Sequence, residues 1–172
     1  MDKVSDFKIF VENFLFTYRQ FCLNEFLHEK VDSDLYKKYI MTWNTILLSL
    51  ETDYLMGLAK VFDRSGETGQ TISVYYFLDH NFTAHQDLIS KIKKLRNKFF
   101  AHLDVRKMRD KEDFLKENQL NRGEISDLFK TINNVVAKLG KEFNLTEDFQ
   151  EIFSQTRDEA RNEGDTWLQP FR

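Results

Sequence analysis

The sequence predicts an all-α protein, a single-domain helical bundle of about five to six helices. Apolar residues make up 41% of the 172 residues, and only one proline and six glycines interrupt them. This composition favours long helices with few turns. Apolar side chains also recur at three- and four-residue steps, the period of an amphipathic helix. We expect one domain over residues 1–161 and an irregular tail over residues 162–172, which holds the only proline.

The first two helices are expected over residues 4–29 and 33–62. Both carry apolar side chains at helical spacing along one face. The second pattern continues for about eight turns, and Ser33 and Asp34 are its candidate N-caps. A polar segment with two glycines, residues 64–71, ends this helix.

Three more helices and one short apolar segment complete the expected bundle. The short segment, residues 72–78, reads ISVYYFL, and we expect a helix there because the chain offers no partner strand. The helix that follows it is expected to run to Leu103. Candidate starting residues for the three helices are Thr83, Asn121 or Arg122, and Thr146.

Charge and cysteine content restrict the class of protein. The net charge is −3, so a contact with nucleic acid must rest on a local basic patch. The single cysteine, Cys22, has no partner for an internal disulfide, which suits a reducing compartment. No apolar stretch approaches the roughly 18 to 20 residues of a membrane span, and no signal segment opens the chain. We therefore expect a cytoplasmic protein with no membrane contact.

The stretch LRNKFFAHLD, residues 95–104, places Arg96, Asn97 and His102 inside an apolar helical segment. Cleaving RNA without a metal requires a group that exchanges a proton near neutral pH, and histidine has an ordinary pKa of about 6.5. It also requires a fixed cation for the charge that develops on the phosphate, which suits arginine. Arg96 and His102 supply such a pair. On a regular helix, however, six residues separate them by about 120°.

Basic residues around this stretch form the local patch that an acidic protein needs to bind RNA. The candidate RNA-binding residues are Lys93, Lys94, Lys98, Arg106 and Lys107. A solvated helix face explains the same lysines equally well. Among the other histidines, His28 at the end of the first helix is explained by the helix dipole. No histidine has metal-ligand spacing to a cysteine or carboxylate, and no glycine-rich phosphate loop is present, so no metal or cofactor is expected.

Two segments together resemble a known superfamily. Residues 96–102, RNKFFAH, resemble the R-x(4–6)-H signature of HEPN domains (higher eukaryotes and prokaryotes nucleotide-binding). Residues 54–78 resemble the L-x-x-L-F-D-R loop and following apolar segment of the AbiU-type abortive-infection branch of that superfamily. The order and spacing of the two segments also fit, and the resemblance covers roughly residues 35–140.

The resemblance implies a homodimer in which Arg96 and His102 of both subunits surround one shared cleft. It also implies a metal-independent endoribonuclease that leaves 2′,3′-cyclic phosphate ends, with Asn97 supporting the other two residues. Such proteins act as toxins or in antiphage defence, and a cognate antitoxin protein is a further expected partner. Some relatives carry a modified tyrosine two residues after the histidine, where this sequence has Asp104. The alternative prediction is a non-catalytic RNA-binding or protein-interaction module, and a purely structural bundle comes third.

The consecutive residues Phe99 and Phe100 support the dimer independently. They lie about 100° apart on a helix, so both rings do not fit one core stripe. A twofold partner that packs motif helix against motif helix would cover the second ring. Another helix of the same chain would do so equally well.

Overall fold

The computed structural model describes residues 2–63, 72–78, 82–97 and 116–171. Every regular element within these ranges is helical, which confirms the predicted all-α class. The seven α-helices and two 3-10 turns are α1 (Lys3–Lys30), α2 (Ser33–Lys38), α3 (Ile40–Val61), α4 (Val74–Phe77), η1 (Thr83–His85), α5 (Gln86–Leu95), α7 (Arg122–Glu142), α8 (Phe149–Leu168) and η4 (Gln169–Phe171). None of the helices in the described ranges is both long and apolar enough to cross a lipid bilayer.

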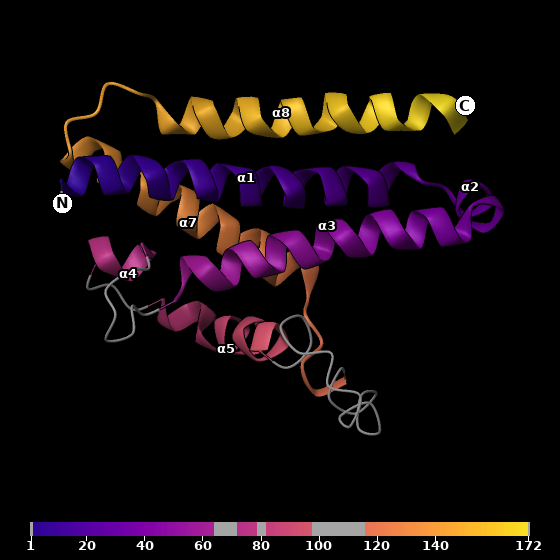
Figure 1. The fold of residues 1–172 in the computed structure, drawn as a ribbon, viewed down its shortest axis with the longest axis horizontal. Coiled ribbons are helices and arrows are strands. Elements are labelled where there is room, and N and C mark those ends of the chain that lie inside the picture. Colours follow the sequence, from indigo (N-terminus) through magenta and orange to yellow (C-terminus); the bar gives the residue numbers. More distant parts are fainter. Residues whose placement is uncertain (1, 64–71, 79–81, 98–115, 172) are drawn as a thin grey trace.

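Three long helices run side by side along the long axis of the molecule (Figure 1). Helix α1 lies in the middle, with α3 packed on one side and α8 on the other. Helix α3 is antiparallel to α1, whereas α8 is parallel to it. Helix α7 crosses this layer obliquely and packs against α8, and α5 packs against α3. The central helix α1 therefore buries apolar side chains against most of the bundle.

The core is aromatic and centres on Phe129 of α7. Its ring stacks on Phe21 of α1 with the centroids 4.5 Å apart, and it lies 5.9 Å from the ring of Phe14. It also meets Tyr54 of α3 edge-on at 6.5 Å. All four side chains are buried. Aromatic pairs at these distances contribute about 0.5–1.5 kcal/mol beyond the burial of their area. Phe129 therefore ties three helices together at one point.

The predicted continuous helix over residues 33–62 is wrong, because the chain breaks at Tyr39. This residue has φ −127° and ψ 37°, outside the helical region, and it separates α2 from α3. Its half-buried ring packs against Phe171 beyond the end of α8, with the centroids 5.0 Å apart. The apolar period continues through Tyr39 although the backbone does not, so periodicity alone did not reveal the break.

The observed caps correct most of the predicted helix starts. Asp32 caps α2 and Asp148 caps α8, because each carboxylate accepts hydrogen bonds from two N–H groups of the first turn. Helix α5 follows a 3-10 turn and has no side-chain cap. Asn121 is confirmed as the cap of α7, and its side chain accepts from the N–H of Gly123 at 2.8 Å. The predicted caps that the structure does not bear out are Ser33, Asp34, Thr83 and Thr146.

The predicted irregular tail over residues 162–172 is also wrong, since α8 continues to Leu168 and ends in a 3-10 turn. Gly164, a residue type that disfavours helix interiors, lies inside α8 against α1. A Cβ there would lie 2.4 Å from Cδ1 of Phe26, so glycine permits the close approach of the two helices. Phe171 then covers the buried Trp43, with ring centroids 5.2 Å apart.

Candidate functional site

Helix α5 carries the first residues of the candidate motif. Its buried side chains pack towards α3 and are Leu88, Ile89, Ile92 and Leu95. The helix passes into a π-helical turn at Arg96 and Asn97. Turns of this kind occur frequently at functional sites, because they redirect the side chains that follow. The predicted continuation to Leu103 can be followed only as far as Asn97, since residues 98–103 lie outside the described residues.

Arg96 joins the end of α5 to the end of α3. Its Nη1 donates a hydrogen bond to Oδ2 of Asp63, and its Nε donates to Oδ1 of Asn97 at 3.0 Å. The side chains of Arg96 and Asp63 are 23% and 28% exposed, respectively. Two acceptors therefore hold a partly buried guanidinium in one orientation. A fixed cation of this kind is suited to stabilising negative charge that develops on a phosphate.

Sequence reasoning did not select Asp63 as a site residue, although it lies in the F-D-R segment that resembles the AbiU-type loop. It directly follows Phe62, the buried residue that caps the C-terminal end of α3. The chain has 28 aspartates and glutamates, so the residue type and its position gave no reason to choose Asp63. The structure brings together the two segments on which the resemblance rests, through the contact between Asp63 and Arg96.

Two of the candidate RNA-binding lysines lie on the last turn of α5. Lys94 is exposed and Lys93 is half-buried. Together with Arg96 they gather three cations at the C-terminal end of the helix, where the helix dipole favours positive charge. The other candidates lie outside the described residues, and they are Lys98, His102, Arg106 and Lys107. A contact between Arg96 and His102 therefore stays a prediction.

A different histidine and arginine do meet within the described residues. Nη2 of Arg122, the first residue of α7, is hydrogen-bonded to Nε2 of His28, and Nε of Arg122 lies 4.0 Å from Oε1 of Glu25. Because the guanidinium only donates, Nε2 of His28 is the acceptor in this bond. Partial burial, and then the charge of Arg122, lower the pKa of His28 to about 4. The helix-dipole explanation of His28 requires an imidazolium ion at neutral pH, so it is wrong.

His28 and Arg122 line an open cleft of about 600 Å³ together with Glu51 of α3. Burial raises the pKa of Glu51, and Arg122 acts in the opposite direction. A histidine with a pKa of about 4 is a poor general acid near pH 7, because almost none of it carries a proton there. The His28–Arg122 pair therefore lacks the chemistry predicted for Arg96 and His102.

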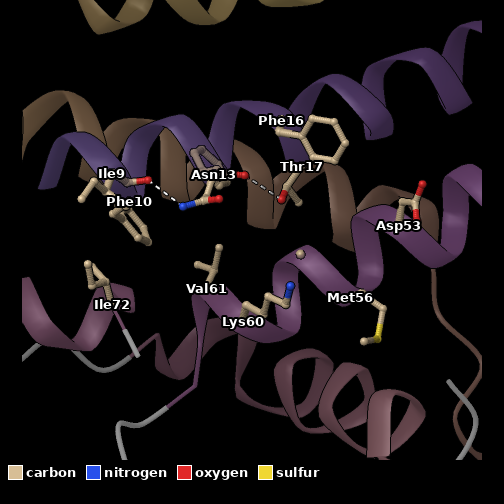
Figure 2. A pocket seen from close by; sticks show the side chains of 12 residues that line it. Ile9, Phe10, Asn13, Phe16, Thr17, Asp53, Met56, Lys60, Val61 and Ile72 are labelled. Carbon is tan, nitrogen blue, oxygen red and sulfur yellow. Dashed lines mark hydrogen bonds between the residues drawn. The ribbon is translucent and has the colours of Figure 1, made fainter. Parts of the chain in front are cut away.

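Another hollow, of about 470 Å³, lies between α1 and α3 (Figure 2). Ile9 and Phe16 of α1 stand at its rim, and their side chains are 45% and 59% exposed. Among the described residues that line it, the charged ones are Asp53 and Lys60, and no histidine lines it. Within the described residues, this groove offers an apolar surface with one carboxylate and one ammonium group beside it.

Neither a metal nor a thiol is supported as a catalytic group by the described residues. No three histidine, cysteine or carboxylate side chains in the described ranges converge into a group that could hold a metal ion. Burial raises the pKa of the Cys22 thiol to about 11. A thiol with this pKa stays protonated at neutral pH and is a weak nucleophile.

Comparison with known protein families places the chain in the class that the fold and Arg96 indicate, the all-α HEPN domains. The family model HEPN_AbiU2, described as AbiU2, matches residues 11–162. This match runs from α1 into α8 and includes Asp63, Arg96 and His102. The chain belongs to the AbiU2 family of HEPN domains, which confirms the resemblance seen in the sequence. No curated protein and no solved structure matches it at a significant level.

Proposed function

We propose that this protein is a metal-independent endoribonuclease of the HEPN type, which acts as a toxin or antiphage-defence effector in the cytoplasm. One observation carries the proposal. In a member of the AbiU2 family, the arginine of the R-x5-H motif is a partly buried cation held by Asp63 and Asn97. Lys93 and Lys94 add positive charge on the preceding turn, as a phosphate backbone requires.

The proposed reaction divides the work between three residues. The 2′-hydroxyl oxygen of the RNA attacks the adjacent phosphorus, and the bond from phosphorus to the 5′-oxygen breaks. His102 accepts the 2′-hydroxyl proton or donates a proton to the leaving 5′-oxygen, and a water molecule carries out the other of these two proton transfers. Arg96 stabilises the negative charge on the phosphate oxygens, and Asn97 orients Arg96 through their hydrogen bond. The products carry a 2′,3′-cyclic phosphate and a 5′-hydroxyl end.

The proposed enzyme is a homodimer with one shared cleft. Arg96 and His102 diverge by about 120° on a regular helix, so two facing motif helices offer a way to bring both groups to one phosphate. Light scattering at micromolar concentration tests this step. A mass that corresponds to the monomer alone would contradict the proposal of a shared cleft. A cognate antitoxin protein is a further proposed partner, whether the protein is a dimer or a monomer.

Incubation of the purified protein with RNA and EDTA tests the activity. We expect cleavage to 2′,3′-cyclic phosphate ends that persists in EDTA and is lost in His102→Ala. His28→Asn is the matched control, because His28 is a histidine of the same chain whose pKa of about 4 makes it unsuitable for the reaction. Loss of cleavage in His28→Asn but not in His102→Ala would contradict the assignment.

The second candidate is a non-catalytic RNA-binding or protein-interaction module of the same family. The net charge of −3 and the carboxylate already bonded to Arg96 favour it. Binding of RNA without cleavage would support this candidate. A protein that neither binds nor cleaves RNA would leave only a structural or protein-binding role.

A further inference from the structure

We propose that Asp63 is a positioning residue for Arg96, an inference that rests on the proposed function. Oδ2 of Asp63 accepts a hydrogen bond from Nη1 of Arg96 across 33 residues of sequence. The aspartate itself does not act on RNA. It sets the direction in which the guanidinium presents its remaining N–H groups to a phosphate.

The backbone on each side of this ion pair is anchored in the core. Phe62 is fully buried, and its ring lies 5.0 Å from that of Phe82 and 6.1 Å from that of Tyr75. The N–H of Asp63 donates to the carbonyl of Lys60 at 3.1 Å. The backbone that carries the Asp63 carboxylate is therefore held in place, because the Phe62 ring is buried and the N–H of Asp63 is hydrogen-bonded.

Arg96 is anchored in a similar way. It directly follows Leu95, a buried residue on the face of α5 that packs against α3. A side chain on a helix leans towards the N-terminus of that helix, so Arg96 reaches back along α5. Asp63 then holds Nη1 and Asn97 holds Nε, and these two acceptors at different corners fix the plane of the guanidinium.

Burial distinguishes this contact from an ordinary surface ion pair. The two side chains are 23% and 28% exposed, whereas those of the Arg19–Glu163 pair are 43% and 29% exposed. Exposed pairs lose side-chain entropy on forming and are screened by salt. A partly buried pair that joins two anchored backbones keeps its geometry, and geometry is what a transition-state contact needs.

Cleavage kinetics of Asp63 variants test the proposal. We expect Asp63→Ala to lower kcat about 10- to 100-fold with a smaller change in KM, because a misdirected guanidinium still attracts RNA but no longer meets the developing charge. Asp63→Asn keeps an acceptor oxygen without the charge, so it should recover part of the loss. Glu163→Ala, which breaks the ion pair between Arg19 and Glu163, is the matched control and should cleave like the wild type.

A double variant separates positioning from a general structural effect. If Asp63 acts through Arg96, then adding Asp63→Ala to Arg96→Ala should cause no further loss of kcat. A loss equal to the product of the two single effects would overturn the proposal. Cleavage by Asp63→Ala at the wild-type rate, in a sample whose thermal unfolding shows it to be folded, would overturn it as well.

An NMR measurement tests the contact without relying on cleavage. The Nη–H signals of Arg96, assigned by their absence in Arg96→Lys, should exchange with water more slowly in the wild type than in Asp63→Ala, because Asp63 accepts from Nη1. If the wild type cleaves no RNA, the proposed function fails, and positioning for that reaction fails with it. If the wild type cleaves no RNA but its Arg96 signals exchange more slowly than those of Asp63→Ala, the ion pair forms and serves another role. Equal exchange in both proteins would show that Asp63 does not hold Arg96.

Discussion

Arg96 and Arg122 are both arginines at a helix end, yet their surroundings differ. Arg122 is the first residue of α7, where the helix dipole disfavours a cation, and the carboxylates of Glu25 and Glu51 offset this cost. Arg96 follows the last turn of α5, where the dipole favours a cation. Within the described residues, Arg122 lies near two carboxylates, whereas Arg96 pairs with the carboxylate of Asp63 and follows the turn of α5 that carries Lys93 and Lys94.

This difference indicates two uses of the same side chain. Arg122 contacts His28 and Glu25 of α1 and acts on Glu51 of α3, so its charge is satisfied by the helices that it joins. Among the described residues, Arg96 has one carboxylate partner, Asp63, and the neighbouring Lys94 on α5 is exposed. An exposed cation beside a fixed guanidinium attracts an anionic ligand, whereas a cation bonded to the helices that it joins stabilises the fold.

The largest expected effect concerns cleavage. Arg96→Ala should slow cleavage of RNA about 100- to 1,000-fold, since loss of one well-placed donor to a transition state has an effect of this size. Arg122→Ala should cleave within about threefold of the wild type, because its contacts are made inside the fold. Initial rates under excess substrate measure both. Equal slowing by the two substitutions would erase the distinction between the two arginines.

Growth of a bacterial host offers a cheaper form of the same comparison. Expression of the wild type should slow growth, while Arg96→Ala should be tolerated. Equal tolerance of both proteins at equal expression would count against a toxin.

Stability should show the reverse order. Arg122→Ala should lower the free energy of unfolding by about 1–2 kcal/mol, because Nε2 of His28 loses its donor and two partly buried carboxylates lose their nearby cation. Arg96→Ala should lower it by less than about 1 kcal/mol, because the Asp63 carboxylate is 28% exposed and is hydrated once its partner is removed. Urea unfolding measures both. A larger loss in Arg96→Ala would mean that Arg96 is mainly structural.

The lowered pKa of His28 should make the stability of the protein depend on pH. Its pKa is about 4 in the folded state and about 6.5 when unfolded, so the unfolded chain binds the extra proton between these values. Stability from this group is complete above about pH 6.5 and falls as the pH drops towards 4. Glu25 and Glu51, whose pKa values are raised by burial, act in the opposite direction near the lower end.

Thermal unfolding of the wild type and His28→Gln between pH 7 and pH 5 isolates this contribution, since both proteins retain the two glutamates. The wild type should lose more stability over this interval than the variant. Parallel curves would show that His28 titrates normally and that Arg122 does not hold it neutral.

The smallest expected effect is on RNA affinity. Lys94→Gln should weaken binding a fewfold and reduce the slope of log affinity against log salt by about 1, as for one lost phosphate contact. Lys138→Gln, on α7, is the control, because Lys138 already faces Glu142 at 3.8 Å. An identical salt slope in all three proteins would place RNA away from the end of α5.

Much of the fold could be predicted from the sequence, since side-chain period is a local property. The periods of α1 and α7 are regular, and both helices appear where expected. The break at Tyr39 was not predicted, because its ring stays in the apolar stripe and only its backbone leaves the helical conformation. The helical end of α8 was not predicted, because Gly164 permits a close contact with Phe26 of α1. A contact between distant segments leaves no local pattern in the sequence.

The candidate site was less accessible to sequence reasoning. Arg96 and Asn97 could be selected by residue type, and their mutual hydrogen bond involves adjacent residues. Asp63 could not, because its role depends on how α3 ends relative to α5. The same limit applied to His28, whose neutral state depends on Arg122, distant in sequence. Placement of His102, Lys98, Arg106 and Lys107 stays a prediction.

Because Phe171 covers Trp43, the fluorescence of Trp43 should report whether the end of α8 is docked on the bundle. The chain has two tryptophans, of which Trp43 is fully buried and Trp167 on α8 is 37% exposed. A buried indole emits at shorter wavelength than a hydrated one, so Trp43 should dominate the blue side of the emission spectrum. Detachment of the end of α8 would hydrate Trp43 and shift its emission to the red, with no label added. A Trp167→Phe variant would leave one reporter, whose quenching by acrylamide follows the opening of that end alone.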